Sequence, residues 1–281
     1  MKSIVFLTLS LLSFSLFPWG FYAHRKINEY AVFCLPEERL KFYRPHLNRL
    51  VDLSVIPDIR KNTAISEFSL HYIDLERYHL NKQNFQDDDF LEFCEANDSC
   101  RSNGILPWHI LRVFNELKTA IRFNQKSLIL RLSGELGHYI SDACVPLHTT
   151  ENYDGHLTGQ NGIHSLWESA LPELFFEEYE LYGIQSDTIV DIPATIWETI
   201  HNSHQLKDSV LLMHKELQDV MAQDVFGITA RNNRLKADYS LSFKRAYHKK
   251  LNQMITKQLK KSILLCASMW ETAWVEAERK K

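Results

Sequence analysis

The sequence predicts an all-α protein with one multi-helix domain over residues 19–281, and three observations support this fold class. Glycine and proline are scarce, with 9 and 8 copies in 281 residues. Runs of β-branched residues are few. Apolar residues recur three and four positions apart over long stretches, which places them on one face of a helix. With 45% apolar and 24% charged residues, the chain can bury a large core.

The first eighteen residues differ from the rest because they contain an apolar run, residues 4–17, behind a single lysine. This run is too short to cross a bilayer comfortably and is typical of a secretory signal peptide. We therefore predict that residues 1–18 are a signal peptide and that the protein is exported, either periplasmic or secreted. A buried hydrophobic helix is the alternative. A small-residue cleavage signal would leave Leu16 first, whereas a chain beginning at Trp19 would require a cut after proline.

The following segment, residues 24–55, predicts two helices separated near Pro36. Ile27, Tyr30, Ala31 and Phe33 are expected to face inward, because they recur at helical spacing. Residues 57–104 lose this periodicity and accumulate acidic and asparagine residues. We expect them to form loops that carry ligands and shape the mouth of a site.

Two strong helices are predicted next, over residues 106–124 and 126–143, where apolar spacing is regular. The Gly-, Asn- and Thr-rich segment 149–162 should form turns at the rim of a pocket. Beyond it we expect helix in residues 165–183, a pair of helical stretches from Pro193 to Gln223, and a long C-terminal helical run. Trp270 and Trp274, four residues apart in that run, are expected to pack into the core.

Charge and cysteine usage limit the possible functions. The formal charge is −3, and it becomes −4 without residues 1–18, which contain one lysine and no acid. This excludes a protein that binds polyanions through a broad basic face. The modest basic stretch from Lys244 to Lys261 is best explained as the solvated side of a long helix.

Five cysteines suit an exported protein with one disulfide. Cys94 and Cys100 lie in a polar loop and are the expected pair. Cys34 and Cys266 are expected to be unpaired core residues. Cys144 lies beside the metal motif described next, so it is a minor candidate for a metal contact.

The segment GELGHYISDACVPLHTT, residues 134–150, carries the main chemical motif. His138 and Asp142 are four apart, so on a helix they share one face and can bind a common ion. Pro146 ends the helix and allows His148 to return over the helix end. His, Asp and His at such positions are typical ligands of zinc.

A second pair with the same spacing, His164 and Glu168, follows near an expected helix start. Five candidate ligands within 31 residues exceed what surface composition explains. His204 and Asp208 share the spacing but have no ligand types clustered around them, so we interpret them as a solvated helix face.

Two further residues lie in suggestive positions. Asp58 follows a proline and precedes Arg60 and Lys61. It is either a metal ligand or part of a surface turn with a salt bridge. His71, in a short apolar stretch, is either a ligand or a core histidine.

Together, these motifs resemble the superfamily of zinc-dependent phospholipase C and single-strand-specific zinc nucleases, and in particular its exported, bacterial, phospholipase C-like members. Trp19-Gly20 followed by His24 is similar to the nuclease-type opening. Asp58 and His71 match the next acid and histidine. LGHYISD, VPLH and HSLWE match the central and final ligand motifs. The resemblance covers nearly the whole chain after residue 18.

The resemblance implies a helical fold with a cleft that holds up to three zinc ions. One zinc would bind Asp58, His71, His138 and Asp142. A second would bind His148, His164 and Glu168. A third would bind Trp19, His24 and a shared oxygen of Asp142. If the mature chain began at Leu16, Trp19 would offer an amide nitrogen, which is a poor ligand.

The sequence departs from the nuclease branch at two points. Its last ligand is Glu168, as in the phospholipase branch, whereas the nucleases use Asp. The interval from His148 to His164 is also short, so the loop that holds a nucleobase in the nucleases is reduced.

The implied activity is zinc-dependent hydrolysis of a phosphodiester, in which a metal-bound hydroxide attacks phosphorus. Asp58 is the candidate catalytic residue, because it can orient or deprotonate the water. Arg60 and Lys61 are candidates to contact phosphate, although a solvent-facing charge is the simpler interpretation of both.

A phospholipid or a single-stranded nucleic acid (or nucleotide) would be the substrate, and the lipid is slightly favoured. An inactive, zinc-stabilised binding module is the alternative from another class. No stable protein partner is expected.

Overall fold

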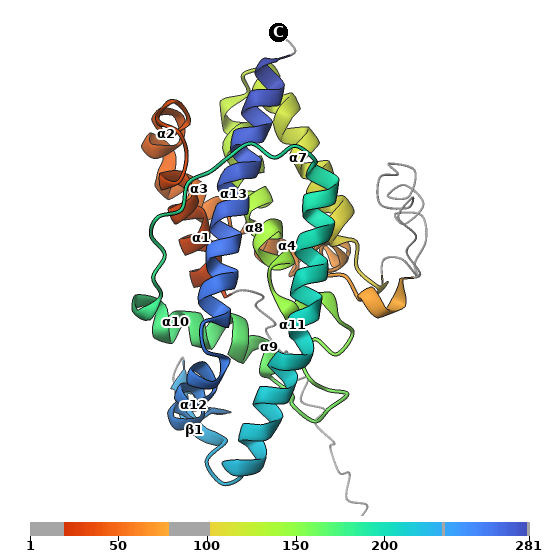
Figure 1. Cartoon of the computed structure of the whole chain (residues 1–281), viewed down its shortest axis with the longest axis vertical. Coiled ribbons are helices and arrows are strands. Elements are labelled where there is room, and N and C mark those ends of the chain that lie inside the picture. The colour runs from red at the N-terminus through yellow and green to blue at the C-terminus, as the bar shows by residue number, and fades with distance from the viewer. Residues whose placement is uncertain (1–19, 79–101, 232–233, 280–281) are drawn as a thin grey trace, which may run out of the picture.

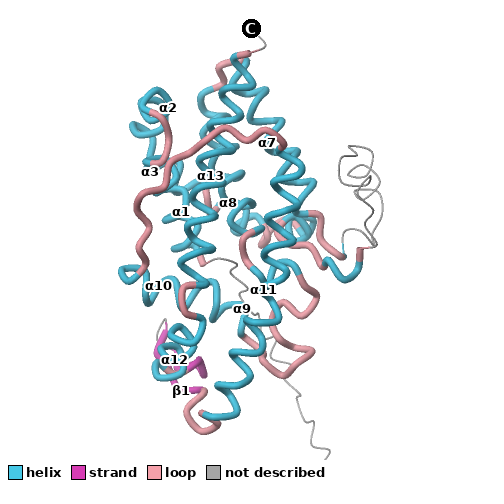
Figure 2. Tube along the Cα trace, viewed as in Figure 1, coloured by secondary structure: helices cyan, strands magenta, loops and turns pink. Residues whose placement is uncertain are grey.

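The computed structural model describes residues 20–78, 102–231 and 234–279, and these are mainly helical, with loops between the helices and one short hairpin (Figures 1 and 2). The all-α prediction is confirmed. The predicted signal peptide, Trp19, and the Cys94–Cys100 pair lie outside the described residues.

The elements follow one another along the chain, with short helical turns between the main helices. In the first half they are α1 (Phe21–Phe33), α2 (Glu37–Tyr43), η1 (Arg44–His46), α3 (Leu47–Leu53), α4 (Ile56–Arg60), η2 (Ile65–Leu70), η3 (Leu75–Arg77), α7 (Leu106–Arg122) and α8 (Lys126–Ala143). In the second half they are η5 (Pro146–Thr149), α9 (Ile163–Ser165), the π-helical η6 (Leu166–Ala170), α10 (Leu171–Phe175), η7 (Phe176–Glu178), α11 (Ile192–Val220), β1 (Phe226–Arg231), β2 (Arg234–Tyr239), α12 (Leu241–Leu251) and α13 (Met254–Glu278).

Helix α8 is the central element of the fold. It contacts α1, α3, α7, α11 and α13, and Figure 1 shows it between the long α13 and α11. Every residue from Leu132 to Ala143 is buried. A helix surrounded on all sides is usually apolar all round, but α8 buries Glu135, His138, Ser141 and Asp142. Buried polar groups need partners, and those partners define the site described below.

Gly137 allows α1 to approach α8 closely. A Cβ at this position would lie 2.2 Å from Asn28 Oδ1 on α1 and 2.8 Å from Cys266 Sγ on α13. Only glycine fits between three helices at this spacing. The approach brings His24, one turn before Asn28 on α1, to the level of Asp142 on α8.

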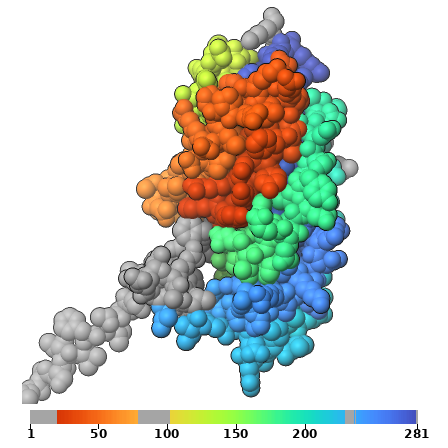
Figure 3. Space-filling model, turned by 90° about the vertical axis from the view of Figure 1, so that its left-hand side faces the viewer, coloured from red at the N-terminus to blue at the C-terminus, as the bar shows by residue number. Residues whose placement is uncertain are grey.

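The first helices agree with the sequence prediction in part. The break near Pro36 is confirmed, and Ile27 and Ala31 are fully buried. The second expected helix, however, is split into α2, η1 and α3, because Pro45 interrupts it. Phe33 was expected to face inward and is 56% exposed, because it lies at the end of α1. Figure 3 shows these early helices (red to orange) above the α9–α10 segment (green) on one face.

The C-terminal third contains the larger corrections. Two helical stretches were expected between residues 193 and 223, whereas α11 is one unbroken helix of 29 residues. The antiparallel hairpin β1–β2 was missed. The basic stretch lies on two helices, α12 and α13, separated at Asn252, which has a φ of 54°. Trp270 is fully buried, as expected.

Among the described residues, Cys34, Cys144 and Cys266 are free, as the sequence predicted. In the described part of the chain, no helix combines the length and the apolar character needed to cross a membrane.

Candidate metal centre

Eight predicted ligands come together in one buried region of the fold, although they are contributed by seven different segments. Their exposed fractions range from 0% to 9%, and His164 is the most exposed. They are His24 on α1, Asp58 on α4, His71 after η2, His138 and Asp142 on α8, His148 on η5, His164 on α9, and Glu168 on η6. The ninth predicted ligand, Trp19, lies outside the described residues.

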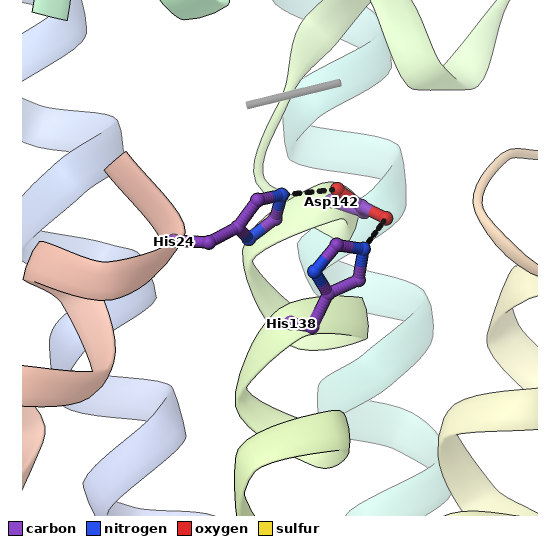
Figure 4. A group of neighbouring side chains, drawn as sticks. All are labelled: His24, His138 and Asp142. Carbon is purple, nitrogen blue, oxygen red and sulfur yellow. Dashed lines mark ion pairs between the residues drawn. The ribbon is translucent and has the colours of Figure 1, made fainter. Parts of the chain in front are cut away.

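The first group is centred on Asp142, which lies between two imidazoles (Figure 4). Asp142 Oδ1 is 3.4 Å from His24 Nε2, and Asp142 Oδ2 is 3.3 Å from His138 Nε2. Two ligands that bind one tetrahedral zinc with bonds of about 2.1 Å are about 3.4 Å apart. The observed spacing therefore suits a shared divalent ion.

The second group consists of Asp58, His71 and His138. His71 Nδ1 lies 2.9 Å from Asp142 Oδ2 and 3.1 Å from His138 Nε2. Asp58 Oδ1 lies 3.8 Å from His71 Nδ1 and 3.7 Å from His138 Nε2. These three residues and Asp142 are the four that the family resemblance assigned to one zinc, and the structure places them together.

The third group consists of His148, His164 and Glu168. Glu168 Oε2 lies 3.1 Å from Nε2 of each histidine. Glu168 is on the π-helical turn η6, and such turns are frequent at functional sites. The expected return of His148 over the end of α8 is also seen, because η5 begins at Pro146.

Hydrogen bonds on the outer side of three rings fix which nitrogen is free to bind a metal. His138 Nδ1 lies 2.8 Å from the Ser54 carbonyl, and His148 Nδ1 lies 2.6 Å from the His71 carbonyl. A carbonyl only accepts, so each Nδ1 carries the proton and each Nε2 keeps its lone pair. His24 Nδ1 lies 2.9 Å from the Ser141 hydroxyl. That hydroxyl donates to backbone carbonyls of α8 and therefore accepts from His24.

Several inward-facing atoms are buried without a hydrogen-bond partner among the described residues. They are His24 Nε2, Asp58 Oδ2 and Asp142 Oδ1. Leaving a buried polar atom unsatisfied costs about 1–3 kcal/mol, and more for a charged group. Divalent cations would satisfy these atoms, so the residues present fit zinc.

The charges of the centre support the same interpretation. Burial lowers the pKa of His24 and of His71, which keeps both rings neutral and able to donate a lone pair. Burial alone would raise the pKa of Asp142, but the neighbouring His138 and His148 hold it well below its usual value. Asp142 is therefore an ionised carboxylate surrounded by nitrogen ligands.

Two expectations about nearby charges are wrong. Arg60 and Lys61 were expected to face solvent. Arg60 instead forms ion pairs with Glu67 and Glu135. The Lys61 side chain is 8% exposed, and its ammonium lies 2.7 Å from Asp58 Oδ1. Lys61 thus adds a positive charge to the centre, whereas the charge of Arg60 is neutralised.

Neither His204 nor Asp208 belongs to a ligand group in the described part of the chain, as the sequence indicated. His204, however, is not on a solvated face, because it is half-buried and lies 2.9 Å from the Thr149 carbonyl. Cys144 is fully buried and is not part of any ligand group in the described chain. A groove of about 540 Å³ along α7 and α8 is lined by none of the predicted ligands.

Sequence reasoning missed Glu67, which lies at the back of the centre. Its carboxylate oxygen Oε1 is 3.5 Å from His71 Nε2. The signal was present, because Glu67 and His71 are four residues apart, the same spacing that identified the other pairs.

Comparison with known families agrees with this geometry. The family model described as zinc dependent phospholipase C matches residues 23–227, a range that includes all eight ligands but not Trp19. No curated protein matches the chain. The matching family consists of zinc-dependent, phospholipase C-like hydrolases, as the resemblance of the motifs implied. The chain belongs to the zinc dependent phospholipase C family.

Proposed function

We propose that the protein is an exported zinc-dependent hydrolase that cleaves phosphodiesters, with a phospholipid as its substrate. The observation that carries this proposal is the convergence of eight buried ligands around Asp142. They form three groups, and the ligand atoms within each group are close enough to bind one metal ion. Zinc bound there would act as a Lewis acid and would lower the pKa of water.

The charge of the centre favours an anionic substrate. The site contains three carboxylates, Asp58, Asp142 and Glu168. With three divalent ions bound, their charges leave an excess of about three positive charges. The Lys61 ammonium beside Asp58 adds another. A phosphodiester anion is therefore attracted to the site even though the whole chain has a formal charge of −3.

Asp58 is proposed as the residue that orients the attacking water and accepts its proton. Its side chain is fully buried, and Oδ2 has no hydrogen-bond partner among the described residues while lying 4.0 Å from His24 Nε2. A carboxylate in this position can ligate through one oxygen and hold a water proton with the other. Lys61 keeps the carboxylate in place from the side.

Three features favour a phospholipid over a nucleic acid. The matching family is that of phospholipase C, and Glu168 occupies the position where the resembling nucleases have Asp. The slightly acidic chain also offers no excess of positive charge for a long polyanion.

Parallel assays test the proposed function. Zinc-loaded protein is given a short-chain phosphatidylcholine and, separately, single-stranded DNA, and product is measured as phosphorylated head group or as nucleotides. We expect head-group release, and loss of at least about 100-fold in Asp58→Asn, because a positioned proton acceptor contributes about 10²–10⁴-fold. Asp208→Asn, an exposed acid next to Lys207, is the matched control. Cleavage of DNA with no release of head group would establish the nuclease alternative.

The same proposal includes export, which rests on the apolar run of residues 4–17. Mass spectrometry of the protein recovered from an expressing culture gives the first residue of the mature chain. A chain that starts at Trp19 supports export and frees the amine for a third ion. A chain that retains residues 1–18 contradicts export.

A further inference from the structure

His71 differs from the other histidines of the centre in the direction of its ring. Its Nδ1, rather than its Nε2, faces inward, 2.9 Å from Asp142 Oδ2 and 3.1 Å from His138 Nε2. Its Nε2 faces outward, 3.5 Å from Glu67 Oε1. The outer nitrogens of His24, His138 and His148 meet neutral oxygens instead. Within the described chain, His71 therefore combines a reversed ring with a carboxylate on its outer side.

Glu67 is held firmly in this position. It is 5% exposed, and Arg60 donates to it twice, at 3.0 and 3.2 Å. Tyr139 donates its hydroxyl to Glu67 Oε1, the same oxygen that faces His71. These partners are next to metal-site residues in sequence, because Tyr139 follows His138 on α8 and Arg60 lies two residues after Asp58 on α4.

We propose that Glu67 is a positioning residue for the metal centre: its carboxylate holds the proton of His71 on Nε2, so that the Nδ1 lone pair faces Asp58, His138 and Asp142. This inference rests on the proposed function, because it requires that the second group binds zinc. A carboxylate behind an imidazole also increases the ring's basicity as a ligand, and loss of such partners typically lowers metal affinity by about 10–100-fold.

Glu135 provides a way to separate this role from simple neutralisation of Arg60. It is also a buried carboxylate and also pairs with Arg60, at 2.5 Å, but through Nη1, whereas Glu67 accepts from Nε and Nη2 and is the acid that lies beside His71. If Glu67 served only Arg60, replacing either acid by its amide would have the same effect on zinc.

The experiment compares Glu67→Gln with Glu135→Gln in the full mature chain. Zinc affinity is measured by competition with a chromophoric chelator, and the unfolding temperature of the metal-free form is measured separately. We expect Glu67→Gln to weaken one zinc by about 10–100-fold and Glu135→Gln to change zinc affinity less than threefold, even where both lower the unfolding temperature. Equal zinc affinity in Glu67→Gln and wild type, or equal losses in both variants, would overturn the proposal.

A second experiment uses only the wild-type protein, so its result does not depend on whether a variant folds. Long-range proton–nitrogen NMR of the zinc-loaded, ¹⁵N-histidine protein reports which ring nitrogen carries the proton. We expect the His71 proton on Nε2 and those of His138 and His148 on Nδ1, and a His71 proton on Nδ1 would refute the inference. Absence of zinc binding in the wild type would instead refute the proposed function, so the two failures are distinguishable.

Discussion

Replacing Gly137 with alanine tests how closely the packing of α1 on α8 controls the metal centre. The added methyl group would lie 2.2 Å from Asn28 Oδ1, about 1.2 Å short of the 3.4 Å at which ordinary contact begins. Asn28 is fully buried and donates to the His24 carbonyl, so it cannot turn away without loss of that bond. Movement of the Asn28 side chain costs that hydrogen bond, and if the side chain stays in place the two helices separate. Overpacking of this kind costs about 1–3 kcal/mol of unfolding free energy.

The separation also changes the site. His24 Nε2 and Asp142 Oδ1 are 3.4 Å apart, and a shift of about 1.2 Å would exceed the spacing of two ligands on one zinc. We expect Gly137→Ala to lose the ion bound by His24 while the group of His148, His164 and Glu168 keeps its ion.

Denaturant unfolding gives the stability, and zinc counted by elemental mass spectrometry gives the occupancy. Gly134→Ala is the control for overpacking on another face of α8, because its methyl would meet Leu53 Cβ at 3.0 Å and the Leu50 carbonyl oxygen at 3.1 Å on α3 and leave the α1 contact intact. It should retain all bound zinc. Full zinc content and unchanged stability in Gly137→Ala would refute this reasoning.

Three further predictions follow from the same geometry. Asp142→Asn should abolish diester hydrolysis and reduce the zinc count, because Asp142 lies within 3.8 Å of four imidazoles; full activity in a diester assay would discard the mechanism. Chelation of zinc should lower the unfolding temperature by roughly 10 °C per site, because free zinc at 1,000 times its dissociation constant adds about 4 kcal/mol to the free energy of unfolding. Calorimetry with and without chelator measures this, and an unchanged unfolding temperature would contradict it. Burial lowers the pKa of His214 to about 4, so the unfolded chain takes up the proton first and stability falls as pH drops below about 6.5. By pH 5 protonation of this residue in the unfolded chain lowers the free energy of unfolding by about 2 kcal/mol. Denaturant titrations at pH 7.5 and 5 should show that His214→Gln removes this part of the pH dependence of stability. The same pH dependence in the variant and the wild type would contradict a buried, neutral His214.

The helices that carry the centre could be predicted because their apolar spacing is regular. The prediction of helix over residues 126–143 is confirmed by α8, which is buried along its second half. The hairpin β1–β2 was missed because a two-stranded ribbon has little apolar patterning of its own, and Ile228 and Leu235 are 77% and 78% exposed. Local propensity could not show that α11 would run without a break, since its contacts with α7, α8 and α12 are non-local.

The candidate site could be predicted to the extent that its ligands are close in sequence. His138 with Asp142, and His164 with Glu168, were found from their spacing alone. His24, Asp58 and His71 depended on the family resemblance, because their partners lie far away along the chain. The orientation of His71 and the role of Lys61 depend on three-dimensional packing, which spacing does not encode.

The zinc content of the purified mature protein tests the convergence of the eight ligands most directly. Elemental mass spectrometry combined with native mass spectrometry gives ions per folded chain. The geometry of three ligand groups predicts about two or three tightly bound zinc ions, with the third dependent on a free Trp19 amine. A folded wild-type chain that binds no zinc after exposure to excess metal would contradict the proposed centre.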